Sequence, residues 1–263
     1  MPTATMRTPL LEVSGVTLQY KTRDHLVTAT YRVDFRVLKS DRFVLLGPSG
    51  CGKSTLLKAI GGYLRPTEGE IRLKGAAVSR PGPDRMMVFQ EFDQLLPWKT
   101  VLDNVMFPLV TSGRLNGREA RARALSYIGK VKLTNFVDSY PHMLSGGMKQ
   151  RAAIARGMAM EPDVLLMDEP FAALDALTRV RMQDELLGLW DDVKFTVIFV
   201  THSIPEAVKI GNRILLLSPH PGQVKAEINS VPRGEDGSPV GIALGRKIHD
   251  VLFADTVEDM DHV

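Results

Sequence analysis

The chain has 263 residues, of which 44% are hydrophobic and 24% are charged, as in an ordinary globular protein with a substantial core. A net charge of +3 without a long basic run argues against a nucleic-acid binder that depends on a cationic face, and the single cysteine, Cys51, excludes an intrachain disulfide. The N-terminus lacks the apolar core of a signal peptide, and no apolar run approaches the roughly 18 residues of a membrane helix. We therefore expect a cytoplasmic chain that reaches a membrane only through a partner.

Two kinds of strand pattern follow each other along the chain. The first 40 residues alternate apolar and polar side chains, as in LEVSGVTLQY and TATYRVDFRV, which predicts antiparallel strands. Farther on, short apolar runs alternate with helical patterns, which is typical of an α/β fold with a largely parallel sheet. These runs, each too short for a buried helix, are Arg42–Gly47, Met86–Gln90, Asp163–Asp168, Phe195–Thr201 and Arg213–Ser218.

Helices are predicted between and after these strands. From about Thr100 to Lys149 the sequence contains no convincing strand, so we expect a helical insert. One of its helices should begin after Asn116, which is a plausible N-cap with Glu119 three residues on. The apolar face of this helix is predicted to consist of Ala124, Leu125, Ile128 and Val131. A later helix should have an apolar face formed by Met182, Leu186, Leu189 and Trp190. Residues 231–239 are typical of a loop, and the tail from Gly241 is expected to form one helix.

The stretch GPSGCGKS, Gly47–Ser54, fits the G-x-x-x-x-G-K-[ST] pattern and lies between a predicted strand and a predicted helix. Its glycines let the backbone curl so that N–H groups point at phosphate oxygens, and the helix that begins near Lys53 adds its positive dipole end. Lys53 should reach the β- and γ-phosphates, and the Ser54 hydroxyl should ligate Mg²⁺. A flexible glycine turn would not explain a lysine and a serine at the helix start. The predicted nucleotide-binding residues of this loop are Gly47, Pro48, Ser49, Gly50, Cys51, Gly52, Lys53, Ser54 and Thr55.

Polar residues end three other predicted strands. Asp168 ends an apolar strand and can hold Mg²⁺ directly or through water, while Glu169 can polarise an attacking water. His202 follows the strand that ends in Thr201, at the edge of the sheet where ligands bind in open α/β folds, and is a candidate γ-phosphate sensor. Gln90 closes a further strand and can contact Mg²⁺ or the attacking water. Alone, each of these residues would be weak evidence; their combination with the phosphate-binding loop favours a nucleotide hydrolase.

A second glycine-rich helix start is found in LSGGMKQR, Leu144–Arg151. The apolar residues Met148, Ala152, Ala155 and Ala159 follow at helical spacing, so Gly146 and Gly147 should lie where a helix begins. Such a start is itself an anion site. Because the chain already has a loop for its own nucleotide, this second site is best explained by a nucleotide held on another copy.

In this order, GPSGCGKS, VFQ, LSGG, VLLMDEP, ALD and VTH resemble the motifs of the ATP-binding subunit of an ABC transporter, over roughly Leu10–Val224. The stretches LLPW and SPHPG narrow the resemblance to the nitrate/sulfonate/taurine importer class. The resemblance implies a P-loop NTPase (RecA-like) core with a mostly parallel sheet, an N-terminal antiparallel β subdomain and a helical insert subdomain. It implies an ABC ATPase domain over residues 10–224, with the insert at about 95–150, and a C-terminal extension, 225–263, of unknown role.

The resemblance also implies roles for single residues. Tyr20 would stack on adenine, although the segment that follows it is longer than usual and KSDR replaces the expected Pro-Gly-Glu turn. Ser145, Gly146 and Gly147 would contact the γ-phosphate bound by the opposite subunit, and Asp175 would cross the dimer interface. The metal ligands would be Ser54, Gln90 and Asp168, and the catalytic residues Glu169, His202 and Gln90. Met148 stands where the commonest signature has glutamine, so altered contacts around the nucleotide are expected.

The implied mechanism requires ATP, Mg²⁺ and several partners. Two copies would close head to tail around two ATP molecules, and hydrolysis would reopen them. The motion would pass through Gln90 and the insert to a separate membrane permease, fed by a solute-binding protein, with this subunit bound to the cytoplasmic face of the inner membrane. FDQLLPW, Phe92–Trp98, is the candidate docking surface, and ordinary packing of the insert is its alternative.

Other functions fit the sequence less well. An ABC-type ATPase of DNA repair or translation would usually carry long coiled-coil inserts or two cassettes, and a P-loop kinase or GTPase would leave LSGG and His202 unexplained. An exporter often has its permease fused to the ATPase, which favours import here. The sequence does not indicate the solute.

Overall fold

The computed structural model describes residues 8–21, 25–90, 94–231 and 235–253. The chain divides into two compact units, the first formed by Met1–Pro81 with Thr196–Val263 and the second by Gly82–Phe195. Among the described residues, no helix is both long enough and apolar enough to cross a membrane.

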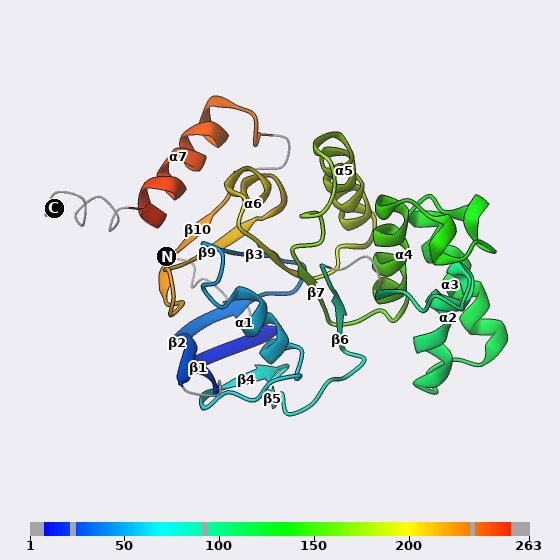
Figure 1. Cartoon of the computed structure of the whole chain (residues 1–263), viewed down its shortest axis with the longest axis horizontal. Helices are drawn as coiled ribbons and strands as arrows, with labels where there is room; N and C mark the ends of the chain where they lie inside the picture. The colour runs from blue at the N-terminus through cyan, green and yellow to red at the C-terminus, as the bar shows by residue number, and fades with distance from the viewer. Residues whose placement is uncertain (1–7, 22–24, 91–93, 232–234, 254–263) are drawn as a thin grey trace, which may run out of the picture. The chain divides into compact units, whose positions relative to one another are not determined.

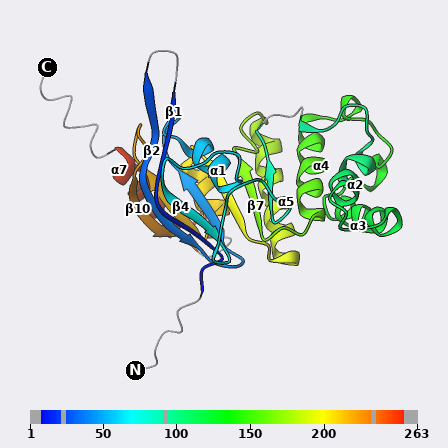
Figure 2. The same cartoon turned by 90° about the horizontal axis from the view of Figure 1, so that it is seen from below.

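An antiparallel sheet opens the first unit. Its strands lie in the order β2-β1-β4-β5, with bounds β1 (Leu11–Lys21), β2 (Leu26–Val37), β4 (Glu68–Leu73) and β5 (Ala76–Ala77). Leu11 of β1 pairs with Val37 on one side and with Leu73 on the other, and all three side chains are buried. Figure 2 shows β1 and β2 running side by side as a long hairpin. The alternating pattern of the first 40 residues therefore predicted these strands correctly.

A parallel set of strands forms the core of the first unit. β3 (Arg42–Leu46) pairs in parallel with β8 (Val197–Thr201) and with β9 (Arg213–Leu217), and β10 (Val224–Asn229) runs antiparallel to β9. All residues of β3 and β8 are buried, which explains their unbroken apolar runs. Helix α1 (Lys53–Ile60) contacts β8, α6 (Ile204–Ile210) contacts β3 and β8, and α7 (Pro239–Phe253) contacts α6, β9 and β10. The helix predicted for the C-terminal tail is thus present.

The second unit combines two parallel strands with a cluster of helices. β6 (Arg85–Val88) pairs in parallel with β7 (Val164–Asp168). Helices α2 (Val101–Thr111), α3 (Gly117–Lys130) and α4 (Gly146–Ala159) contact one another, and α4 also contacts β6 (Figure 1). The remaining elements are the short 3-10 helices η2 (Thr134–Phe136) and η3 (Pro141–Met143) and the helix α5 (Ala176–Val193). Parallel strands, an N-terminal antiparallel sheet and helices in the insert confirm the predicted fold class.

Helix α3 shows where the predicted apolar face was right and where it was wrong. Asn116 caps it as expected, since its side chain accepts from the Glu119 N–H while the Glu119 carboxylate accepts from the Asn116 N–H. Ala124 and Ile128 are buried, but Leu125 is 38% exposed. The buried face is completed by Tyr127, because residues three and four apart share a face of a helix and Leu125 lies beyond its edge.

Two predicted strands are shorter than expected. The strand predicted over Met86–Gln90 ends at Val88, because the Gln94 side chain binds both the N–H and the C=O of Phe89 and takes them out of the strand ladder. The strand predicted from Phe195 begins at Val197. The Phe195 carbonyl instead accepts a hydrogen bond from Nε1 of Trp190, near the end of α5. Trp190 itself is only half-buried. In both cases a side chain replaces a neighbouring strand as the partner of the backbone.

Candidate nucleotide site

The glycine-rich loop between β3 and α1 has the backbone that its sequence predicts. Gly50 and Gly52 have φ values of 81° and 96°, in the left-handed region that favours glycine. A Cβ atom on Gly52 would lie 2.5 Å from the Ala29 carbonyl oxygen, so no larger residue fits at this position. Gly52 is also the N-cap of α1, and it makes no side-chain capping bond. The first turn of α1 is therefore left to bind an anion through its N–H groups.

Lys53 closes this loop from inside. Its ammonium donates to the carbonyl oxygens of Gly47 and Pro48, each at 2.8 Å, and the residue is only 4% exposed. The Cys51 sulfur lies 3.9 Å from Lys53 Nζ, and burial raises the pKa of the Cys51 thiol. Cys51 is thus a buried neutral thiol that fills the loop. Ser54 and Thr55 follow in the first turn of α1, where both are half-buried.

His202 lies at the same sheet edge as this loop. In the parallel pairing of β3 with β8, Leu46 stands opposite Thr201, so the loop and His202 leave neighbouring strands together. His202 is exposed, while the turn beneath it is fixed by buried groups. The Thr201 hydroxyl donates to the Glu206 carboxylate at 2.5 Å and accepts from the Ser203 N–H at 3.0 Å. The motif alone gave no reason to single out Glu206.

The acidic residues and Gln90 meet at one edge of the second unit. Val88 of β6 stands opposite Met167 of β7, so Asp168 (the last residue of β7), Glu169 and Gln90 all lie at the carboxyl ends of two paired strands. Asp168 is 6% exposed, Glu169 is half-buried and Gln90 is exposed. Glu169 has a φ of 42°, a left-handed conformation that is uncommon for a residue with a side chain and is often found at functional sites.

Gln94 holds the segment that carries Gln90. Its amide accepts from the Phe89 N–H at 3.1 Å and donates to the Phe89 carbonyl at 2.9 Å. The Gln94 backbone carbonyl in turn accepts from Arg156 of α4 at 2.8 Å. The sequence placed Gln94 only in the candidate docking stretch, because no motif indicates that its side-chain amide binds Phe89, the residue after β6. Phe92 and Asp93 of that stretch lie outside the described residues.

The serine and glycines of LSGG form the start of α4. Ser145 is the N-cap, and its hydroxyl accepts from the Met148 N–H at 3.4 Å. Ser145 is exposed, whereas Gly147 is buried, and a Cβ atom on Gly147 would lie 3.2 Å from Thr178 Cγ2 of α5. The helix start that the sequence predicted is present, and it lies against the first turn of α5.

Asp175 caps that neighbouring helix. Its carboxylate accepts from the Thr178 N–H at 3.0 Å, and hydrogen bonds from the Thr178 side chain and backbone lower the pKa of Asp175. The preceding loop is held by Arg179, whose guanidinium donates to the carbonyls of Phe171, Ala172 and Leu174. Asp175 is exposed on this fixed loop, in a position to contact another molecule.

Tyr20 is half exposed near the end of β1, where it pairs with Val27 of β2.

A sequence model of the family described as "ABC transporter" matches residues 31–172, more than half of the chain. The chain belongs to the ABC transporter family. The taurine import ATP-binding protein TauB of Rhizobium johnstonii is 51% identical to it over 203 residues, which cover 77% of each chain. The bicarbonate transport ATP-binding protein CmpD of Synechocystis sp. is 40% identical over 237 residues, which cover 88% of this chain and 84% of the relative.

A solved structure supports the assignment of the chain to this family. The dimeric structure of a post-hydrolysis state of the ATP-binding cassette MJ0796, bound to ADP and Pi, superposes with a TM-score of 0.73 at 34% identity. The match covers 83% of this chain and 98% of that one. The predicted resemblance to ATP-binding subunits of the importer class is thus confirmed. As a member of this family, the chain is an ATPase.

The ABC ATPase carries its expected site residues in three groups. The loop Gly47–Thr55 and His202 share one sheet edge of the first unit. Asp168, Glu169 and Gln90 share one edge of the second unit. The Ser145–Gly147 start of α4 and the Asp175 cap of α5 lie together, also in the second unit. The roles of these residues toward a nucleotide remain predictions.

The donors available to a metal ion in the ABC ATPase suit Mg²⁺. Within the described ranges, no group of three or more His, Cys, Asp or Glu side chains gathers as a metal cluster. Mg²⁺ usually binds through one or two carboxylates together with substrate phosphates and water, and in the second unit the buried carboxylate of Asp168 is an oxygen donor of this kind.

Proposed function

We propose that this ABC ATPase acts as a dimer that closes around two ATP molecules and powers the import of a small solute through separate permease subunits. The observation that carries the proposal is the helix start at Ser145–Gly147, which the chain has in addition to the glycine-rich loop before α1. An exposed serine and two glycines at a helix start suit a phosphate. The MJ0796 cassette, with which the chain shares its fold, is described as dimeric.

The residues divide the work on ATP as follows. The backbone of Gly47–Thr55 and the Lys53 ammonium bind the phosphates, and Tyr20 stacks on adenine. Asp168, Ser54 and Gln90 would hold Mg²⁺, which neutralises phosphate charge when bound. Glu169 accepts a proton from the attacking water, and His202 contacts the γ-phosphate. Ser145, Gly146, Gly147 and Asp175 face the second copy.

The solute class is inferred from the relatives. One is named for taurine import and another for bicarbonate transport, and both solutes are small and carry an anionic group, the sulfonate of zwitterionic taurine and the bicarbonate ion itself. We infer a small solute that carries an anionic group, such as nitrate, taurine, another sulfonate or bicarbonate, delivered by a solute-binding protein to a permease. The ATPase then lies on the cytoplasmic face of the inner membrane, with no nucleic-acid partner. The ATPase domain of residues 10–224 performs this work, and residues 225–263 form an extension.

Dimer formation is the direct test. Glu169→Gln should retain ATP binding, lose nearly all turnover and accumulate as an ATP-dependent dimer, measured by light scattering after gel filtration. Adding Ser145→Arg should abolish that dimer while the ATP affinity of the monomer, measured with a fluorescent ATP analogue, stays within about twofold. A dimer that survives Ser145→Arg would contradict the role of Ser145, and an unchanged turnover of Glu169→Gln would contradict the role of Glu169.

A further inference from the structure

The helices that carry the two predicted dimer-facing groups touch at a tight contact and an ion pair. The tight contact joins the starts of α4 and α5, where Gly147 lies against Thr178. The ion pair lies farther along, where Arg151 Nε of α4 is 2.8 Å from Glu185 Oε2 of α5. Arg151 lies less than two turns from Ser145, and Glu185 lies about three turns from Asp175.

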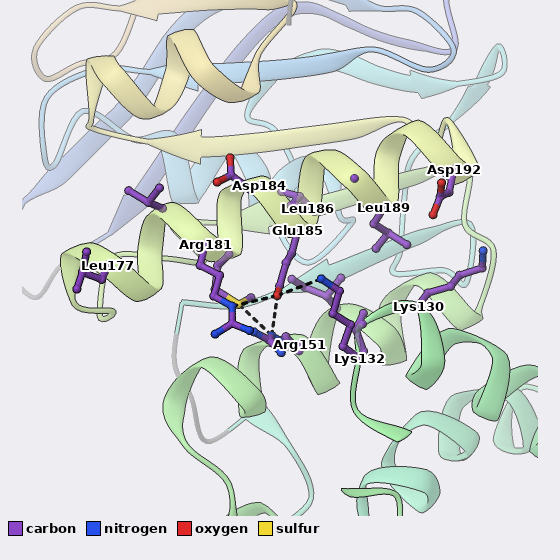
Figure 3. Close-up of a pocket in the computed structure, with 15 residues that line it drawn as sticks. Lys130, Lys132, Arg151, Leu177, Arg181, Asp184, Glu185, Leu186, Leu189 and Asp192 are labelled. Carbon is purple, nitrogen blue, oxygen red and sulfur yellow. Dashed lines mark hydrogen bonds and ion pairs between the residues drawn. The ribbon is translucent and has the colours of Figure 1, made fainter. Parts of the chain in front are cut away.

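Glu185 gathers cations from three segments. Its other oxygen, Oε1, is 3.5 Å from Arg181 Nε on the same helix and 3.8 Å from Lys132 Nζ, which follows α3. Figure 3 shows Glu185 projecting from α5 toward Arg151, with Arg181 and Lys132 on either side. The side chains of Arg151 and Glu185 are 15% and 16% exposed, whereas Arg181 and Lys132 are mostly exposed. The Arg151–Glu185 pair is therefore the partly desolvated centre of the cluster.

Beside this pair, α4 and α5 are separated by a groove. A cavity of about 630 Å³ is lined by Arg151 and Ile154 of α4 and by Leu186 and Leu189 of α5, among others. Because apolar side chains do not close this space, the ion pair bridges the two helices where packing does not. Arg151 Nε also lies 3.4 Å from Met182 Sδ, which fixes the guanidinium against α5.

We propose that Arg151 and Glu185 are positioning residues that hold the Ser145–Gly147 anion site at a fixed distance from the Asp175 loop, so that both meet the second copy together. This inference rests on the proposed dimer. The ion pair gives α4 and α5 a second fixed point, farther along both helices than the close approach of Gly147 to Thr178. The pair acts through these groups and touches no nucleotide itself.

The energetics favour this role over general stabilisation. A partly buried ion pair contributes little net stability compared with apolar packing, while loss of one partner leaves an uncompensated charge. If Glu185 is replaced, Arg151 cannot remove its uncompensated charge by losing its proton, because a guanidinium stays protonated in proteins. The remaining partner would then turn toward water or toward the other charged groups, and the spacing between the helices would change.

The test uses the Glu169→Gln protein, in which the ATP-dependent dimer accumulates. Glu185→Gln and Arg151→Gln should each weaken that dimer about tenfold, and the double variant should be no weaker than either single one. The ATP affinity of the monomer should stay unchanged in all three. Asp191→Asn is the matched control, because it removes a carboxylate from the same helix whose partner, Lys194, lies 3.0 Å away in an exposed pair. This control should dimerise like its parent.

The outcomes separate this inference from the proposed function. If the Glu169→Gln parent fails to dimerise with ATP, the proposed function is wrong. If the parent dimerises and both single variants dimerise equally well, or if their effects simply add, the positioning role is wrong. A loss of monomer ATP affinity equal to the loss of dimer affinity would also overturn it. If Glu185→Gln fails to fold, Arg151→Gln compared with Asp191→Asn decides the question.

Discussion

Lys53 shows how a motif residue depends on partners that the motif does not name. A buried ammonium is costly unless hydrogen bonds compensate it, and here the carbonyls of Gly47 and Pro48 do so. These carbonyls face inward only because Gly50 and Gly52 adopt left-handed conformations. The sequence predicted that Lys53 reaches phosphate, but its carbonyl partners follow from the curl of the loop. The ammonium is thus held at the loop, largely removed from water, before a phosphate arrives.

Lys53→Ala should therefore weaken ATP binding about tenfold or more, because it removes the charge that meets the phosphates. A titration with a fluorescent ATP analogue measures this. Lys58→Ala is the control, since Lys58 lies on the same helix with its side chain exposed and should bind ATP like the wild type. Equal affinities of the two variants would contradict the assignment of the phosphate-binding loop.

At the scale of elements, the loop before α2 is built around one buried amide. Asn104 Oδ1 accepts from the Leu96 N–H at 2.8 Å, and Nδ2 donates to the carbonyls of Leu96, Lys99 and Thr100 at 3.0–3.1 Å. Asn104 is fully buried. These bonds give the backbone of the loop the partners that a strand or helix would otherwise provide. The loop is therefore a fixed platform for the side chains that it exposes.

Asn104→Ala should lower the free energy of unfolding by about 2–3 kcal/mol, because it leaves a buried N–H and several carbonyls without this partner. Urea unfolding followed by circular dichroism measures the change. The adjacent exposed Asp103 provides the control, and Asp103→Asn should change the free energy of unfolding by less than about 1 kcal/mol. Equal stabilities of the two variants would show that the amide network does not support the loop.

The same kind of side-chain contact limits what the sequence can predict about elements. Apolar runs correctly located β3, β7 and β9, while the N-cap residue Asn116 and the glycine pair Gly146 and Gly147 correctly located the starts of α3 and α4. The prediction was wrong where a side chain from a following loop binds the backbone, as Gln94 does at Phe89 five residues earlier. It was also wrong for Leu125, because the face of a helix that is buried depends on its neighbours as well as on its own residues.

At the scale of the whole molecule, each of the two units carries candidate site residues of its own. The motifs could be found from sequence because each consists of adjacent residues at the end of a strand or the start of a helix. Ion pairs such as Arg151–Glu185 could not be found, since they join residues of ordinary type whose spacing carries no signal. The order of motifs thus identifies the family, while the connections between motifs require the fold.

The surface around Trp98 provides the last prediction, which concerns the assembled transporter. Trp98 is 71% exposed on the loop that Asn104 fixes, and Phe107 and Val110 of α2 are also exposed. Large exposed aromatic side chains on a fixed loop are typical of an interface. We expect Trp98 to contact the permease, as the sequence suggested for the end of the docking stretch.

Trp98→Ala should weaken binding to the permease about thirtyfold or more and lower its co-purification with the ATPase accordingly, because truncation of a central aromatic anchor typically costs about 2 kcal/mol or more. Quantified co-purification from detergent-solubilised membranes measures this, with ATP turnover of the isolated subunit as a check on folding. Tyr63→Ala is the control, since Tyr63 is an exposed aromatic residue of the other unit. Permease recovery that is equal for Trp98→Ala and Tyr63→Ala would mean that Trp98 only covers the insert, which is the alternative that the sequence left open.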